Sequence, residues 1–196
     1  MTRIFAAMML VILVGACSGK ADLNEPPVPL GDFSLTHNIV VAGKAQRGPL
    51  SRKATEEQLV ETVRAAVAER FDRYDGASRY HFGISVEGYV LAVPGVPLVV
   101  SPKSALILNL TVWDDAAGKK LNEEPHQITV LETFGTGTLI GSGYTLSAEE
   151  QLVQLSQNAA KSVERYLVRQ MKSQGWFMPD DLTVDDVAEE DAAATG

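Results

Sequence analysis

The sequence has 196 residues, a formal net charge of −8 at pH 7 and a single cysteine. An acidic chain lacks the clustered Lys and Arg side chains that phosphate binding needs, so we expect no nucleic-acid partner. With one cysteine, the fold cannot contain an internal disulfide, even in an oxidising compartment.

The first 16 residues have the pattern of an export signal. Arg3 gives a short positive region, residues 4–14 are all apolar, and the small residues Gly15 and Ala16 follow. A helix of this apolar length rises about 16 Å, whereas a hydrocarbon core is about 30 Å thick. The segment is therefore predicted to be a cleaved signal peptide rather than a permanent membrane span.

The residues Val14, Gly15, Ala16 and Cys17 resemble the lipobox of bacterial lipoproteins, which is an aliphatic residue, two small residues and a cysteine. The resemblance implies cleavage between Ala16 and Cys17, a diacylglycerol thioether on Cys17, and a fatty acyl chain such as palmitate on the new amino terminus. Two or more acyl chains make a stable membrane anchor, whereas one binds marginally. Ser18 after the cysteine resembles the signal for outer-membrane sorting. The alternatives are a plain secretory peptide with an incidental cysteine, or a thiol that pairs with another chain.

The remaining chain divides by composition into three parts. Residues 17–32 contain three prolines and no apolar period, which predicts a flexible, lipidated tether. Residues 33–177 carry the periodic apolar patterns of a single domain. Residues 178–196 contain seven acids and no base, which predicts a disordered acidic tail.

Two helices are predicted from capping boxes followed by apolar stripes. Thr55 and Gln58 open the first helix, and Gly76 is expected to end it in a left-handed conformation. Ser147 and Glu150 open the second, which Gly175 closes, with Trp176–Phe177 folding back onto the core. The predicted buried stripes are Leu59, Val63, Ala66, Val67, Arg70 and Phe71, and Leu152, Leu155, Ala159, Val163, Tyr166, Leu167 and Met171, whereas Lys161, Glu164 and Arg169 are expected to face outward.

Alternating apolar residues predict strands at 33–42, 80–93, 105–113 and 127–134, with a further short strand at 96–100. In the first strand, Phe33, Leu35, Ile39 and Val41 are expected to share one face. In the second, a change of phase at Gly88 predicts a bulge. The last two strands flank turn residues that include Gly118, which predicts an antiparallel hairpin. The order of elements predicts an α+β fold, with an antiparallel-rich sheet of four to five strands and two helices packed on one face.

No catalytic, cofactor-binding or metal-binding motif is present. The glycines in residues 135–144 have neither the dinucleotide fingerprint nor the P-loop spacing, so they predict a tight or mobile connector. The three histidines, His37, His81 and His126, are too widely spaced to form a recognisable ligand motif. Turn chemistry explains the adjacent Asp114 and Asp115.

The lipobox and the outline of the domain resemble small, periplasm-facing outer-membrane lipoproteins of proteobacteria. These include the lipopolysaccharide-assembly lipoprotein, lipoprotein activators of cell-wall synthases and the amino-terminal domain of the Tol-system propeller protein. Residues 141–160 also resemble uncharacterised alphaproteobacterial lipoproteins. The anchor, the tether and the lack of catalytic motifs lead us to expect a non-enzymatic adaptor or assembly factor that meets the membrane through Cys17 and binds an envelope protein. The alternatives are a lipid- or glycolipid-binding component of an envelope transport system, and an enzyme.

Overall fold

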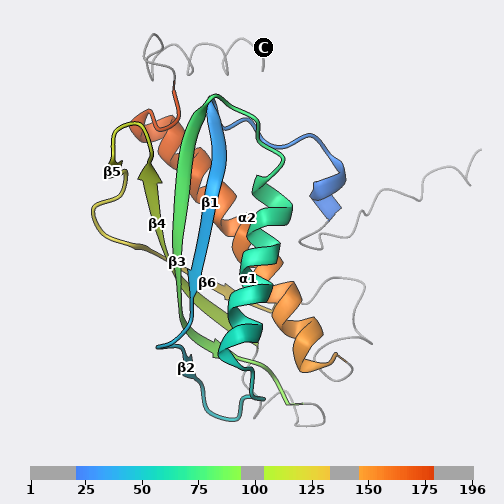
Figure 1. Cartoon of the computed structure of the whole chain (residues 1–196). Coiled ribbons are helices and arrows are strands. Elements are labelled where there is room, and N and C mark those ends of the chain that lie inside the picture. The colour runs from blue at the N-terminus through green and yellow to red at the C-terminus, as the bar shows by residue number, and fades with distance from the viewer. Residues whose placement is uncertain (1–20, 94–103, 133–145, 179–196) are drawn as a thin grey trace, which may run out of the picture.

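The computed structural model describes residues 21–93, 104–132 and 146–178. Over these residues the chain forms one sheet with two helices on one of its faces (Figure 1). The elements in chain order are η1 (Ala21–Asn24), β1 (Phe33–Val41), β2 (Gln46–Arg47), α1 (Glu56–Phe71), β3 (Ser78–Val90), β4 (Ala105–Asp114), β5 (Lys119–Lys120), β6 (His126–Leu131) and α2 (Ala148–Gln174). The α+β fold predicted from the sequence is confirmed.

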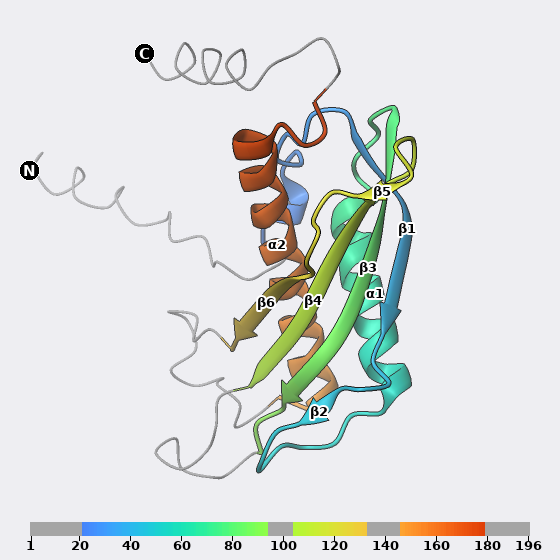
Figure 2. The ribbon, with the colours of Figure 1, turned by 90° about the vertical axis from the view of Figure 1, so that its left-hand side faces the viewer.

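The described part of the sheet has six strands, because two two-residue strands, β2 and β5, join the four longer ones. β1 lies at one edge and pairs with β3 in parallel, and β3, β4 and β6 follow as antiparallel neighbours. Figure 2 shows α1 and α2 together behind the sheet, with the opposite face uncovered by any labelled element. We call this uncovered surface the open face.

Both helices begin as predicted. Thr55 and Ser147 each accept a hydrogen bond from the backbone N–H three residues on, and Gln58 and Glu150 complete the two capping boxes. Gly175 ends α2 with φ of 69°, which is the left-handed cap expected of it. Every residue of the two predicted apolar stripes is buried.

The end of α1 differs from the prediction. The helix ends at Phe71 with Asp72 as a right-handed cap, and Gly76 does not adopt a positive φ. Gly76 is instead needed for close packing, because a Cβ there would overlap the backbone of Asp32 and Phe33. Its N–H donates to the Phe33 carbonyl, so this glycine seats the start of β1 against the turn that follows α1.

The strand β1 also differs from the prediction, because a bulge changes its phase. Its register against β3 slips between Leu35 and His37, so Thr36 is the extra residue. Phe33 and Val40 are therefore buried, whereas the side chains of Ile39 and Val41 are 60% and 53% exposed on the open face. The expectation that Phe33, Leu35, Ile39 and Val41 share a face was wrong for this reason.

The remaining strands follow their predicted patterns. The bulge predicted at Gly88 is confirmed as a register slip between Val86 and Gly88. The turn after β4 contains Gly118 with φ of 59°, and the predicted hairpin is confirmed by the antiparallel pairing of β4 with β6. The predicted strand at 96–100, the predicted connector at 135–144 and the tail from residue 179 lie outside the described residues.

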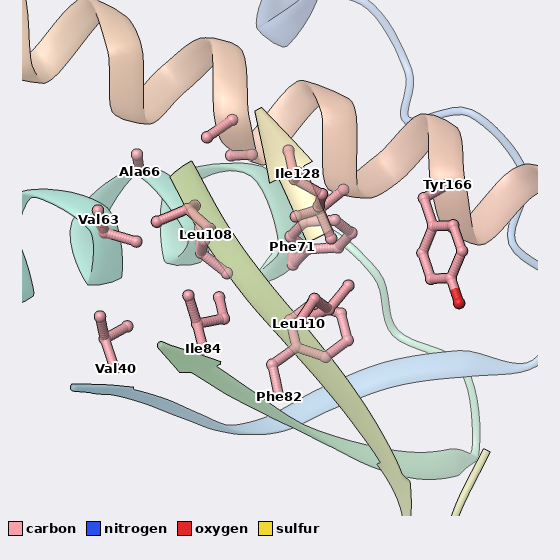
Figure 3. Close-up of a cluster of buried hydrophobic side chains, with 14 of the residues drawn as sticks. Val40, Val63, Ala66, Phe71, Phe82, Ile84, Leu108, Leu110, Ile128 and Tyr166 are labelled. Atoms are coloured by element: carbon pink, nitrogen blue, oxygen red, sulfur yellow. The ribbon is translucent and has the colours of Figure 1, made fainter. Parts of the chain in front are cut away.

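The hydrophobic core fills the space between the sheet and the helices. In Figure 3, Val40, Ile84 and Leu108 extend from the strands toward Val63 and Ala66 of α1. At one end of this core, the ring of Phe33 lies 4.9–6.0 Å, centroid to centroid, from five other rings. They belong to Phe71, Tyr74, Tyr80, Phe82 and Phe177.

Candidate functional site

A buried ion-pair network joins the two helices to the segment that precedes the domain. Arg70 of α1 is 3% exposed and lies 2.8 Å from the carboxylate of Glu164 in α2, which is 4% exposed. The same guanidinium donates to both carboxylate oxygens of Asp22 in η1, each at 3.1 Å. Lys161 of α2 also pairs with Asp22, and the Tyr74 hydroxyl donates to Glu164 at 2.9 Å. We call this set of five side chains the tether latch.

The electrostatics of the tether latch favour the ionised forms of Asp22 and Arg70. The hydrogen bond from Arg70 lowers the pKa of Asp22 far below its ordinary value, with Lys161 adding to the effect. Burial opposes the charge on Arg70, but Asp22 and Glu164 outweigh it and raise the pKa of the guanidinium. Burial and the adjacent Glu164 carboxylate raise the pKa of Tyr74, which therefore stays a neutral donor. Across the physiological pH range, Asp22 and Arg70 are therefore ionised and Tyr74 is neutral.

The latch corrects the extent of the predicted flexible tether. From Ala21 the segment is attached to the helices, because Arg73 also donates to the carbonyls of Leu23 and Glu25. Further on, Leu30 is 1% exposed, and Asp32 donates its N–H to the Phe177 carbonyl at 2.8 Å. Figure 1 shows η1, the short blue helix, on the side of the helices away from the sheet.

We predict that Asp22→Asn weakens the latch in a pH-dependent way. The variant is expected to lose about 1–2 kcal/mol of stability at pH 7, because a charge-assisted, partly exposed pair becomes a neutral contact. Since the folded pKa of Asp22 is depressed, its contribution is complete above about pH 4 and is lost as the pH falls further. Urea unfolding of both proteins between pH 2.5 and 7 measures this difference.

Glu25→Gln provides the matched control, since Glu25 is an exposed acid of the same segment. We expect it to differ from the wild type by less than about 0.5 kcal/mol. A difference between wild type and Asp22→Asn that stayed constant down to pH 2.5 would contradict the assignment to the Asp22 carboxylate.

The second candidate feature is a shallow hollow of about 260 Å³ on the open face. Its lining is mixed, with apolar side chains from β1 and small or polar residues from β3 and β4. Gly83 lies in its floor, where no side chain of its own fills the space. The lining residues are Ile39, Val41, Gly83, Ile84, Ser85, Glu87, Asn109, Thr111 and Pro125.

Two of the three histidines meet on the open face. The rings of His37 and His81 are 4.7 Å apart, centroid to centroid, and His81 Nε2 is 3.0 Å from a carboxylate oxygen of Asp115.

His126 is separate from them, because it begins β6 and stacks on Tyr166 of α2 at 3.7 Å. Burial lowers the pKa of His126, with Arg169 adding to the effect. Asp114 accepts from the Ala117 N–H, as its predicted turn role requires.

We predict that His81→Phe raises the pKa of Asp115 toward its ordinary value. The hydrogen bond from His81 is the largest cause of the lowered pKa of this carboxyl, and the charges of His81 and Arg79 add to it. Carbon-detected NMR titration of the Asp115 carboxyl measures the shift. Arg79→Gln is the control, because it removes a longer contact of 3.8 Å and is expected to give a smaller shift. An unchanged Asp115 titration in His81→Phe would be the contrary result.

Within the three described ranges, no group of three or more His, Cys, Asp or Glu side chains is arranged to hold a metal ion. No helix in the same part of the chain is long and apolar enough to cross a membrane. The predicted lipidation and cleavage residues, Ala16 and Cys17, lie outside the described residues.

The sequence analysis did not identify Asp22 and Tyr74 as site residues, and it placed Glu164 on the outer face of its helix, whereas the structure buries it. The one available signal was Arg70, a charged residue in a predicted apolar stripe.

Comparisons with known proteins give similarity at the level of the fold. Neither a protein-family model nor a curated protein sequence matches the chain. A Xanthomonas campestris protein of the family DUF330 is 16% identical, with 76% of this chain and 94% of that chain covered and a TM-score of 0.45. The PelC dodecamer subunit from Paraburkholderia phytofirmans is 9% identical over 70% and 89% of the two chains, with a TM-score of 0.37.

A minor lipoprotein from Acinetobacter baumannii is 14% identical over 69% of this chain and 91% of that chain, with a TM-score of 0.25. The solved structures similar to this chain thus include a DUF330 protein and a lipoprotein of proteobacteria. At these identities and scores the similarities assign no function. The function is therefore argued from the tether latch and the open face.

Proposed function

We propose that this protein is a lipid-anchored envelope protein that acts as a non-enzymatic adaptor or assembly factor on the periplasmic side of the bacterial outer membrane. The lipobox residues Val14 to Cys17 support the anchor, and Ser18 supports outer-membrane sorting. The adaptor role rests on how the tether latch positions that anchor relative to the open face.

The latch shortens the connection between the membrane and the domain. Cys17 precedes Ala21 by four residues, so their Cα atoms are at most about 14 Å apart. Because Arg70 and Lys161 hold Asp22 against the helices, this short connection ends at the helix layer rather than at the sheet. The helix layer thus lies between the anchor and the open face, which leaves the open face accessible to a periplasmic partner. This placement of η1 is the observation that carries the proposal.

Membrane fractionation with cross-linking and affinity capture tests the proposal, comparing wild type with Cys17→Ser. We expect the wild type in the outer-membrane fraction, with one defined envelope protein captured, and the variant in the soluble periplasmic fraction without it. Labelling with a fatty-acid analogue should mark the wild type and not the variant. Equal fractionation and equal capture of the two forms would overturn the anchor.

A second experiment separates the latch from the anchor. Asp22→Asn retains Cys17 and should remain lipidated and in the membrane fraction, but capture of the partner should fall because the domain is no longer held in place. Glu25→Gln should behave like the wild type in both readouts. Unchanged capture with Asp22→Asn would show that the latch does not position the partner surface.

The hollow on the open face is the observation that favours the alternative, a lipid- or glycolipid-binding component. A carrier is expected to hold its ligand between the sheet and the helices, but that space is filled by the hydrophobic core. The hollow is shallow, and its volume of about 260 Å³ lies below the roughly 300–1,000 Å³ of typical ligand pockets. We therefore rank this role second. Native mass spectrometry of protein extracted from membranes tests it, because a carrier would retain a lipid that Gly83→Leu excludes.

A further inference from the structure

The edge strand β1 lacks the charged residues and prolines that usually prevent an edge strand from pairing with another chain. Its sequence, Phe33–Val41, contains no charged residue and no proline. In the described part of the chain it pairs with β3 on one side, and no strand lies on its other side. Exposed edge strands are usually interrupted by Lys, Pro or a bulge, since their unpaired N–H and C=O groups otherwise recruit a further strand.

The opposite edge of the sheet is formed by β6 and, further along β4, by β5. β5 consists of two exposed lysines, Lys119 and Lys120, whereas β1 has none. In β1 the bulge at Thr36 interrupts the beginning of the strand but leaves His37–Val41 regular in its pairing with β3. This run of five residues, about 17 Å long, is the part of the edge that remains available.

We propose that a second copy of this chain pairs with this edge, so that the two His37–Val41 segments form an antiparallel pair with Ile39 on the two-fold axis. With Ile39 on the axis, all five residues of each segment have a partner, and His37 lies opposite Val41 of the other copy. With Asn38 or Val40 on the axis, only three residues of each segment would have a partner. The axis at Ile39 also brings together two copies of this residue, whose side chain is 60% exposed in the single chain.

The membrane anchor favours this arrangement over other contacts between copies, an argument that rests on the proposed function. When two sheets join edge to edge in antiparallel fashion, the two-fold axis is perpendicular to the joined sheet. Both helix layers, and with them both η1 segments, then lie on the same side, so both lipids can enter one membrane. Packing of two open faces against each other would direct the two anchors away from each other.

The helix behind the edge does not oppose the pairing. The Asn38 side chain donates to the Arg64 carbonyl at 2.9 Å, which places this turn of α1 beside the middle of β1. Arg64 and Glu61 are both exposed there and have opposite charges. The α1 helix of a copy related by the two-fold axis therefore meets a surface with both positive and negative side chains, rather than one with charges of a single sign.

Cysteine cross-linking of the full-length protein in native membranes tests the proposal. Cys17 is the one cysteine of the sequence and is blocked if it is lipidated. Residues directly opposite in an antiparallel pair have Cα atoms about 4.5–5.5 Å apart, within disulfide range. Ile39→Cys is therefore expected to form a covalent dimer under mild oxidation, at least tenfold above the wild type.

Val41→Cys is the matched control, because its side chain is similarly exposed on the same face of the same strand. Two Val41 positions would be about 13 Å apart across the axis, too far for a disulfide. Co-expressed His37→Cys and Val41→Cys chains should, in contrast, form a mixed dimer. No dimer with Ile39→Cys, or an equal yield with Val41→Cys alone, would overturn the pairing.

The wild-type protein in the same experiment shows whether a negative result contradicts the proposed edge pairing or the proposed membrane anchor. A wild-type protein that itself forms a disulfide dimer, or leaves the membrane fraction, has an unmodified Cys17 and contradicts the anchor. The pairing is then tested in the Cys17→Ser background with the same three positions. A lipidated, membrane-bound Ile39→Cys protein without dimer contradicts the pairing alone.

Discussion

Arg70→Met is expected to lower the free energy of unfolding by about 3–5 kcal/mol. The reason lies in Glu164, which is 4% exposed and would lose its charge partner inside the protein. The Tyr74 hydroxyl would remain as a donor, but a neutral hydrogen bond does not replace the guanidinium. Equilibrium urea unfolding at pH 7 measures the loss, with an unchanged m-value showing that the two-state transition is retained.

The double variant Arg70→Met/Glu164→Leu separates the stability of the fold from the position of the tether. Buried ion pairs are often replaceable by apolar residues of similar volume, so the double variant is expected to recover most of the loss. It should nevertheless leave Asp22 without its main partner, so hydrogen exchange at residues 22–25 should be faster than in the wild type. A double variant as unstable as Arg70→Met would contradict an unpaired Glu164 as the cause.

The helices and β4 could be predicted from the sequence because local rules determine them. Capping boxes at Thr55 and Ser147 marked the helix starts, and the helical period identified the buried stripes. The alternation in β4 is equally clear, since Leu106, Leu108, Leu110 and Val112 are all at most 1% exposed. In each case the sequence signal and the packing have the same period, so the predicted apolar positions are the buried ones.

The tether latch could not be predicted in the same way, because it depends on how α1 and α2 meet. Arg70 lies in a predicted apolar stripe, but its partner Glu164 is 94 residues away and was expected to face outward. A charged residue at the margin of a helical stripe usually reaches solvent. Glu164 is buried because α1 packs beside it and supplies Arg70, and nothing in the sequence of α2 alone indicates that contact. Asp22 was assigned to a flexible tether, because the proline-rich stretch after it contains no apolar period.

The phase of β1 shows the same limit at the level of one residue. The apolar residues at odd-numbered positions predicted that these side chains share the buried face. However, Ile39, Val40 and Val41 are three consecutive apolar residues, so the sequence is equally compatible with Val40 facing the core instead. The bulge at Thr36 decides between these two arrangements, since it allows Phe33 to enter the aromatic cluster and Val40 to enter the core. A consequence is that Ile39 and Val41 reach the open face, where both line the hollow and Ile39 is available for the proposed edge pairing.

Phe33→Ala is expected to lower the free energy of unfolding by about 3–5 kcal/mol, because it leaves a cavity in the core. Phe33 is 1% exposed, and its ring is in contact with five others. One of these is Phe177, beyond the end of α2, and the Phe177 carbonyl accepts from the Asp32 N–H. The loss should therefore loosen the C-terminal end of the domain as well. Urea unfolding measures the energy, and near-ultraviolet circular dichroism reports the aromatic packing.

Two neighbouring valines, Val40 and Val41, test which residues of β1 face the core. Val40 is 8% exposed and Val41 is 53% exposed, so the same truncation to alanine is made on opposite faces of β1. We expect Val40→Ala to cost about 1–3 kcal/mol and Val41→Ala less than about 0.5 kcal/mol. If the costs were reversed, β1 would follow the simple alternation without a bulge, and Ile39 would lie in the core. The contact between two exposed Ile39 side chains would then be lost, so this comparison tests one basis of that inference without depending on the membrane anchor.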